Sequence, residues 1–170
     1  MLRQDLRVKA RRQYQRDDAV SLLKVLATDG TGAMIVYRLM QGAREAGLPP
    51  LEMLLNKVNA WSGCVIGRGA EFGPGFVLFH AGGVVINGRV RGGENVHLQH
   101  AVTLGDNGYG ETPVLGNDVF IGAGAKVIGA VAVGDGARIG ANAVVVKDVE
   151  AHTTVVGIPA RPVARRRREG

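Results

Sequence analysis

The sequence predicts a mainly β protein, a parallel β-helix of six-residue repeats with a small N-terminal α-helical cap. Three observations support this fold. An aliphatic or phenylalanine residue recurs at every sixth position over most of residues 66–145, glycine often follows it, and a small residue often stands four positions after it. A period of six fits neither the 3.6-residue α-helix nor the two-residue alternation of a strand. It suits short strands joined by tight turns.

The repeated residue occurs in two runs. The keyed positions are Ile66, Phe72, Leu78, Val84, Val90, Val96 and Val102, then Leu115, Ile121, Val127, Val133, Ile139 and Val145. Three six-residue sides close one triangular coil of eighteen residues, so each keyed residue is expected to point inward and stack on its equivalent eighteen positions away. Glycine or asparagine at the turns tolerates positive φ.

A thirteen-residue step between Val102 and Leu115 interrupts the period. We expect a loop near residues 106–113 to leave the coil there, and loops on rigid scaffolds often carry binding and catalysis. The β-helix is expected to span residues 63–160, followed by a basic tail at residues 161–170.

Residues 1–62 are expected to form a helical cap on the first coil. Three helices are expected, ending at Leu26, before Gly47 and near Trp61. Asp17 and Asp18 can cap the first of them, and two prolines at positions 49 and 50 can begin the third.

Composition excludes several classes of protein. Hydrophobic residues make up 46% and charged residues 21% of the 170 residues, which excludes a disordered chain. Cys64 is the only cysteine, so no intrachain disulfide can form. The charged first residues lack the apolar core of a signal peptide, and no apolar run approaches the roughly 20 residues needed to span a bilayer. We therefore expect a cytoplasmic protein.

Half of the net charge of +6 belongs to the C-terminus. Residues 164–170 carry four arginines and one glutamate, and without them the net charge is +3. Nucleic-acid binding would need a basic face interleaved with aromatic residues, which the remaining chain lacks. No nucleic-acid partner is expected.

Residues 78–163 resemble the serine acetyltransferase branch of the bacterial hexapeptide-repeat transferases. The matching stretches are HAGGVVI at 80–86, VTLG at 102–105, VFIGAGAKVIG at 119–129 and GIPAR at 157–161, with a looser match at RDDAV, residues 16–20. The resemblance implies a homotrimer of left-handed β-helices with active sites between subunits. It also implies that acetyl-CoA lies between adjacent prisms, with the acceptor near the helical region.

His80 matches the family's catalytic histidine. Acetyl transfer from a thioester to an alcohol needs a general base, and neutral imidazole suits this role because its ordinary pKa of about 6.5 lies near working pH. His100 is an alternative base, one coil and two residues further on. His97 and His152 are interpreted as surface residues. No cysteine or carboxylate completes a ligand set with these histidines, so no metal is expected.

The chain departs from the family pattern at three places. Phe79 replaces the aspartate that usually precedes the catalytic histidine, and Val65 stands where a second aspartate usually orients the imidazole. Thr112 replaces a second histidine in the loop. A backbone carbonyl, Glu111 or Asp106 then remains as the partner that orients His80.

The resemblance also implies binding residues. Asp17 matches the acidic residue that holds the amino group of serine, and Thr112 is placed with it at the acceptor. Residues implied for acetyl-CoA are Gly105, Asp106, Asn107, Ala123 and Ala141, with Lys126, Lys147 and Arg161 for its phosphates.

Three functions remain open from the sequence. The first is an acetyl-CoA-dependent O-acetyltransferase that acts on L-serine. The second is an O-acetyltransferase of a sugar, a polysaccharide or another small alcohol, which would fit the lost carboxylates. The third is a β-helix retained as a scaffold. The chain ends in glycine rather than the isoleucine typical of the family's docking tail, so no complex with cysteine synthase is expected.

Overall fold

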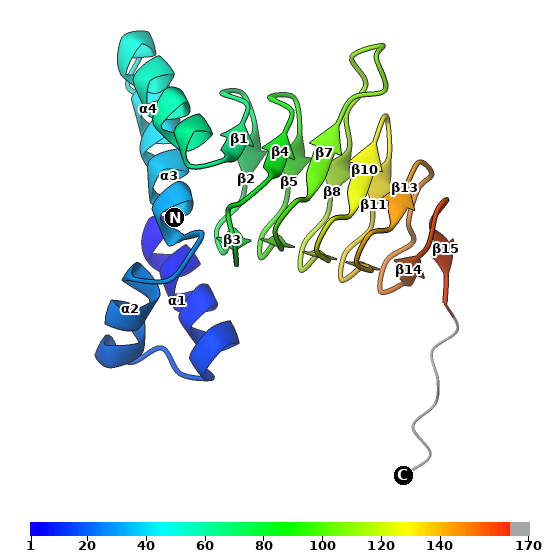
Figure 1. Ribbon diagram of the computed structural model, residues 1–170, viewed down its shortest axis with the longest axis horizontal. Coiled ribbons are helices and arrows are strands. Elements are labelled where there is room, and N and C mark those ends of the chain that lie inside the picture. The colour runs from blue at the N-terminus through cyan, green and yellow to red at the C-terminus, as the bar shows by residue number, and fades with distance from the viewer. Residues whose placement is uncertain (164–170) are drawn as a thin grey trace.

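The computed structural model describes residues 1–163, and over these the chain folds into four α-helices followed by a parallel β-solenoid (Figure 1). The helices are α1 (Leu2–Tyr14), α2 (Ala19–Leu26), α3 (Thr31–Glu45) and α4 (Pro49–Trp61). They gather at one end of the solenoid and cover its first coil (Figure 1). The expected basic tail, with its four arginines, lies outside the described residues beyond position 163.

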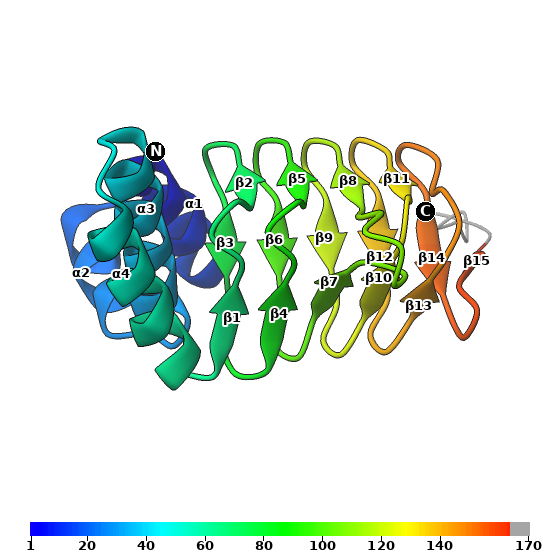
Figure 2. The same cartoon turned by 90° about the horizontal axis from the view of Figure 1, so that it is seen from above.

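Three sheets form the sides of the prism (Figure 2). The first contains β1 (Cys64–Ile66), β4 (Val84–Ile86), β7 (Thr103–Gly105), β10 (Lys126–Ile128) and β13 (Val144–Val145). The second contains β2 (Glu71–Phe72), β5 (Arg91–Gly92), β8 (Val114–Leu115) and β11 (Ala132–Val133). The third contains β3 (Val77–Leu78), β6 (His97–Leu98), β9 (Phe120–Ile121), β12 (Arg138–Ile139), β14 (Thr154–Val156) and β15 (Arg161–Pro162).

Neighbouring strands come from successive coils and run parallel, apart from the antiparallel pair of β14 and β15. This arrangement confirms the predicted parallel β-helix and is consistent with the left-handed form. All thirteen keyed residues are buried and form the core of the prism. Asn95 and Asn142, with several glycines, adopt positive φ at the turns, as the turn chemistry predicts.

The predicted stacking partners are wrong over the first coil. Ile66 pairs with Ile86, twenty residues on, and Val84 pairs with Cys64. The step from Leu78 to Ile86 takes eight residues, whereas a regular side takes six. Two extra residues therefore widen the corner between β3 and β4. The period does not reveal this shift because buried aliphatic residues stand at both spacings, as at Val84 and Ile86 and again at Val96 and Leu98.

The segment between β7 and β8 leaves the coil, and Figure 1 shows it rising above the prism. Its base is tied down, because Asp106 accepts hydrogen bonds from Asn87 Nδ2 at 2.8 Å and from the Gly108 amide at 2.7 Å. Asn107 Nδ2 donates to Glu111 Oε2 at 2.7 Å. Tyr109 stands exposed at the tip. We call residues 106–113 the excursion.

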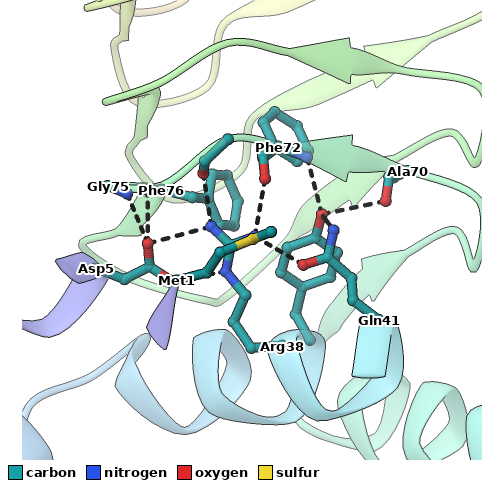
Figure 3. A network of polar contacts seen from close by, with 10 residues as sticks. Met1, Asp5, Arg38, Gln41, Ala70, Phe72, Gly75 and Phe76 are labelled. Carbon is teal, nitrogen blue, oxygen red and sulfur yellow. Dashed lines mark hydrogen bonds and ion pairs between the residues drawn. The ribbon is translucent and has the colours of Figure 1, made fainter. Parts of the chain in front are cut away.

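Helix α1 is the element that the sequence did not predict. Six of its thirteen residues are charged, and they interrupt the apolar face by which a helix is usually predicted. In the structure a buried ion pair holds it, with Arg38 Nε of α3 lying 2.7 Å from Asp5 Oδ2 (Figure 3). Asp5 also accepts hydrogen bonds from the amides of Gly75 and Phe76 on the first coil. These contacts dock α1 and α3 together onto the β-helix.

The remaining helices agree with prediction. Asp18 is the N-cap of α2, because its carboxylate accepts a hydrogen bond from the Ser21 amide at 2.8 Å. Within residues 1–163 no single helix is long and apolar enough to cross a membrane. The pair α2 and α3 meets those criteria only when combined, and it is bent by 89° at the break.

Candidate active site

The candidate site lies along one edge of the prism, where the third sheet turns into the first. On successive coils this edge carries His80, His100, Ala123 and Ala141. Backbone hydrogen bonds of 2.8 Å join neighbouring coils there, from Ala101 N to Gly82 O and from Asn142 N to Ala123 O. We call this line of corners the histidine edge. Its first corner, which contains His80, is the one widened by two residues.

His80 makes its side-chain hydrogen bond with a residue of the helical region. Its Nδ1 lies 3.0 Å from Oδ2 of Asp29, in the turn between α2 and α3. A carboxylate can only accept, so Nδ1 carries the hydrogen and Nε2 of the neutral ring keeps its lone pair. The His80 side chain is 53% exposed. The site therefore presents an accessible imidazole in a single tautomer.

Within one chain the hydrogen-bond partner of His80 is Asp29, and not one of the partners that the sequence offered, which were a backbone carbonyl, Glu111 and Asp106. Asp106 and Glu111 belong to the excursion, which leaves at the corner between the first and second sheets. Their carboxylates accept hydrogen bonds from asparagine side chains and from the Gly108 amide. Asp29 lies 51 positions before His80 and outside the repeats. Its only sequence signal is the Asp-Gly pair, which marks a turn and not a partner.

The carboxylate of Asp29 is held in its charged form. Partial burial acts to raise its pKa, but hydrogen bonds from His80 and from the backbone of Gly30 and Ala81 outweigh this and lower the pKa below its usual value. The Gly30 amide donates to Asp29 Oδ1 at 2.7 Å. The second carboxylate oxygen therefore remains directed to the His80 ring as an anionic acceptor.

His100 lies against His80 on the next coil. Their ring centroids are 5.9 Å apart, at an interplanar angle of 75°. The following residue, Ala101, has φ of 55°, a left-handed conformation that a non-glycine residue rarely adopts. The structure thus brings both candidate bases together at one place.

His97 is buried, which corrects its interpretation as a surface residue. The residue is 4% exposed, and the ring packs edge-on against Phe79 with centroids 6.1 Å apart. Burial lowers the pKa of His97 to about 4, so it is neutral at physiological pH. Phe79, which precedes His80, is half-buried by this contact. The departure from the family pattern at Phe79 is therefore matched by an aromatic neighbour.

The two acceptor residues implied by the resemblance lie apart from His80. Asp17, between α1 and α2, forms an ion pair with Arg11 at 2.6 Å. Thr112 is half-buried in the excursion, at a different edge of the prism from His80. Within residues 1–163, no hydrogen bond or ion pair joins either residue to His80.

The residues implied for acetyl-CoA fall into three places. Gly105 ends β7, Asp106 and Asn107 begin the excursion, and Ala123 and Ala141 lie on the histidine edge. Lys126 also reaches that edge, where its ammonium donates to the carbonyl of Ala101. The last two, Lys147 and Arg161, line a cavity of about 280 Å³ at the C-terminal end of the coil.

A metal site at the histidines was weighed from the sequence, and the structure bears on it only through the placement of possible ligands. Within residues 1–163, no group of three or more histidine, cysteine, aspartate or glutamate side chains is placed to hold a metal ion. His80 and Asp29 are instead a hydrogen-bonded pair.

Comparison with known proteins gives consistent relatives. A family model described as bacterial transferase hexapeptide (six repeats) matches residues 112–147. A serine acetyltransferase of Helicobacter pylori is 37% identical over 169 residues, which cover 96% of this chain and 99% of the relative. One from Mycobacterium tuberculosis is 44% identical over 105 residues, covering 60% of this chain and 46% of the relative.

Solved structures agree with this assignment. Serine acetyltransferase from Neisseria gonorrhoeae superposes with a TM-score of 0.86 at 34% identity, covering 96% of this chain and 65% of that one. The Brucella abortus enzyme in complex with coenzyme A gives a TM-score of 0.83 at 34% identity, covering 94% of this chain and 66% of that one. The chain thus spans about two thirds of these structures and nearly all of the Helicobacter relative. It is an acetyl-CoA-dependent acyltransferase, and it belongs to the serine acetyltransferase family of hexapeptide-repeat enzymes.

Proposed function

We propose that this enzyme is a serine O-acetyltransferase in which His80 is the general base and Asp29 orients it. The observation that carries the proposal is the 3.0 Å hydrogen bond between His80 Nδ1 and Asp29 Oδ2. Because this bond selects the tautomer with a free Nε2, the ring is prepared to accept a proton. The serine acetyltransferase relatives, and the Neisseria gonorrhoeae enzyme solved in complex with serine, support serine as the acceptor.

The chemistry balances with these residues alone. Nε2 of His80 takes the proton from the serine hydroxyl as its oxygen attacks the thioester carbonyl carbon of acetyl-CoA. The C–S bond then breaks, and the departing thiolate takes the proton from Nε2 to give coenzyme A and O-acetylserine. The Asp29 carboxylate stays ionised and steadies the imidazolium formed in between. His80 is therefore unchanged after each turnover.

The homotrimer that the resemblance implies gives Thr112 a role at the active site of a neighbouring subunit. His80 lies on the histidine edge, whereas the excursion with Thr112 leaves at another edge of the same prism. A homotrimer would place the excursion of one subunit against the histidine edge of its neighbour. We expect sedimentation to give three chains per particle. Chains with His80→Ala and chains without residues 107–112 are each expected to be inactive alone. If one active site uses residues of two subunits, mixed trimers of the two variants are expected to regain activity.

The test of the proposal is thiol release from acetyl-CoA in the presence of L-serine. His80→Ala is expected to lower kcat by at least about 10²-fold, and Asp29→Asn by about tenfold or more. His152→Ala is the matched control, because it removes an exposed histidine far along the coil. Parallel reactions of His100→Ala decide between the two candidate bases.

Acceptor choice is tested in the same assay. Phe79, in place of a carboxylate beside His80, makes the corner more apolar, so homoserine, sugars and other small alcohols are assayed beside serine. Release that requires serine and is lost in His80→Ala supports the proposal. Release with a sugar alone moves the enzyme to another acceptor, and full activity in His80→Ala rejects the base.

A further inference from the structure

Lys9 of α1 is a buried cation whose contacts converge on the active-site corner. Its side chain is fully buried, and its ammonium donates to three acceptors: the carbonyl of Asp29, Thr31 Oγ1 at 3.0 Å and the carbonyl of Leu78 at 2.8 Å. An ammonium has three N–H donors, so its capacity is filled. Lys9 thereby joins three segments that are distant in the sequence.

Two of these acceptors belong to the two backbone segments that carry Asp29 and His80. The Asp29 carbonyl is part of the residue whose carboxylate contacts His80, and Leu78 stands two residues before His80 at the end of β3. One cation therefore connects the backbone that carries the carboxylate to the backbone that carries the imidazole. The third acceptor, Thr31, begins α3 directly after the same turn and also donates to Val25 O at 2.8 Å.

A separate feature shows how closely these two segments are packed. Gly30 has φ of 77°, and a Cβ built on it would lie 2.4 Å from the Leu78 carbonyl oxygen. The turn between α2 and α3 therefore rests directly on the β3 end, with no room for a side chain. Lys9 donates to the same carbonyl from α1. The position of Asp29 relative to His80 is thus fixed by packing and by a buried cation together.

We propose that Lys9 is a positioning residue for the reaction, holding the Asp29 carboxylate at hydrogen-bond distance from His80. This rests on the proposed role of His80 as the base. Removing the ammonium releases the turn from β3, so the carboxylate no longer selects the tautomer of the ring. Small displacements of catalytic groups reduce rates strongly.

The buried ion pair of Asp5 and Arg38 provides a matched control on the same helix. Asp5 is as buried as Lys9 and also ties α1 to the first coil, but its contacts are Gly75 and Phe76, at the corner before β3 (Figure 3). Asp5→Asn therefore weakens the docking of α1 without touching Asp29 or Leu78. A purely structural role for Lys9 predicts the same behaviour in both variants.

The first experiment reads the tautomer of His80 and needs no acceptor. Two-bond ¹H–¹⁵N spectra of the full-length protein labelled with ¹⁵N-histidine report which ring nitrogen carries the hydrogen, with His80→Ala for assignment. Wild type and Asp5→Asn are expected to hold hydrogen on Nδ1 of the neutral ring. Lys9→Met and Asp29→Asn are expected to show a mixture of tautomers.

The second experiment is a double-mutant cycle on kcat with acetyl-CoA and serine at pH 7.0. Burial lowers the pKa of Lys9 to about 8, although the Asp29 carboxylate opposes this, so the side chain is mostly charged at that pH. Lys9→Met is expected to lower kcat about tenfold in the wild type but less than about twofold when Asp29 is already Asn. The KM for acetyl-CoA is expected to stay unchanged.

Two outcomes overturn the proposal. One is a Lys9→Met protein that keeps the Nδ1 hydrogen on His80, and the other is an equal loss of kcat in both backgrounds. If Lys9→Met does not fold, Lys9→Gln retains a donor amide and is expected to change the tautomer in the same direction, less strongly. Full activity in His80→Ala rejects the proposed base, whereas the tautomer spectra still decide the role of Lys9.

Discussion

Buried His97 predicts a specific loss of stability in acid. The ring is 4% exposed, and its Nε2 has no hydrogen-bond partner among the described residues. Burial lowers its pKa to about 4, with Arg12 and Arg138 nearby also opposing a positive charge and Asp118 partly favouring it. An unfolded histidine has a pKa of about 6.5. The unfolded chain therefore takes up a proton first as the pH falls.

The magnitude follows from proton linkage. Well above pH 6.5 both states are neutral at this residue, and it contributes almost no pH dependence. Between pH 6.5 and pH 4 the free energy of unfolding falls, and from pH 7.5 to pH 5.0 the two pKa values give a loss of about 2 kcal/mol per chain. His97→Leu, which keeps the volume and cannot titrate, is expected to lack this component.

Urea unfolding followed by circular dichroism at pH 7.5 and 5.0 measures the contribution of His97 to the free energy of unfolding. The quantity of interest is the difference between wild type and His97→Leu in the change with pH, which cancels the titration of all other groups. His100→Gln serves as the control, since His100 is exposed. Equal acid sensitivity of wild type and His97→Leu would refute the assignment of His97 as a buried neutral base.

Two further substitutions test the packing of the first coils. Arg38→Met leaves the buried carboxylate of Asp5 without its cation and is expected to lower the free energy of unfolding in urea by about 3–5 kcal/mol. The added change Asp5→Leu should recover part of this loss. A loss below about 1 kcal/mol would contradict the buried pair. Gly92→Ala places a Cβ 2.3 Å from Phe72 Cδ1 and is expected to cost about 1–3 kcal/mol, lowering Tm. Phe72→Leu in the same chain should restore some of this loss, and no recovery would argue against the clash.

The repeat pattern was sufficient to predict the β-helix and its core. Aliphatic residues at a period of six, often followed by glycine, point inward on every side of such a coil, and all thirteen are buried there. The same pattern could not reveal the shift at the first corner, because Val84 is buried whether it stacks on Ile66 or on Cys64. Helix α1 was not predicted because buried charged residues, and not an apolar face, hold it in place.

The site was predictable only where a local motif carries it. His80 stands in a stretch shared with a known family, and His100 follows it by one coil. Asp29 has no such stretch around it, and its meeting with His80 depends on how the helices dock onto the first coil. Lys9 was hidden in the same way, because a lysine in a charged helix reads as a surface residue until its three buried acceptors are seen.

The corners of this β-helix differ in length, so the number of residues in one coil can change without changing the coils on either side of it. Paired residues on neighbouring coils are separated by 20, 23, 18 and 16 positions on the third sheet, yet the strands stay in register. An insertion at an edge alters only the surface there, since the chain re-enters the next side at the same height. Acceptor choice in such an enzyme can therefore be re-engineered by lengthening or shortening corners. In a fold where one added residue shifts the register of every residue after it, the same change would disrupt the core.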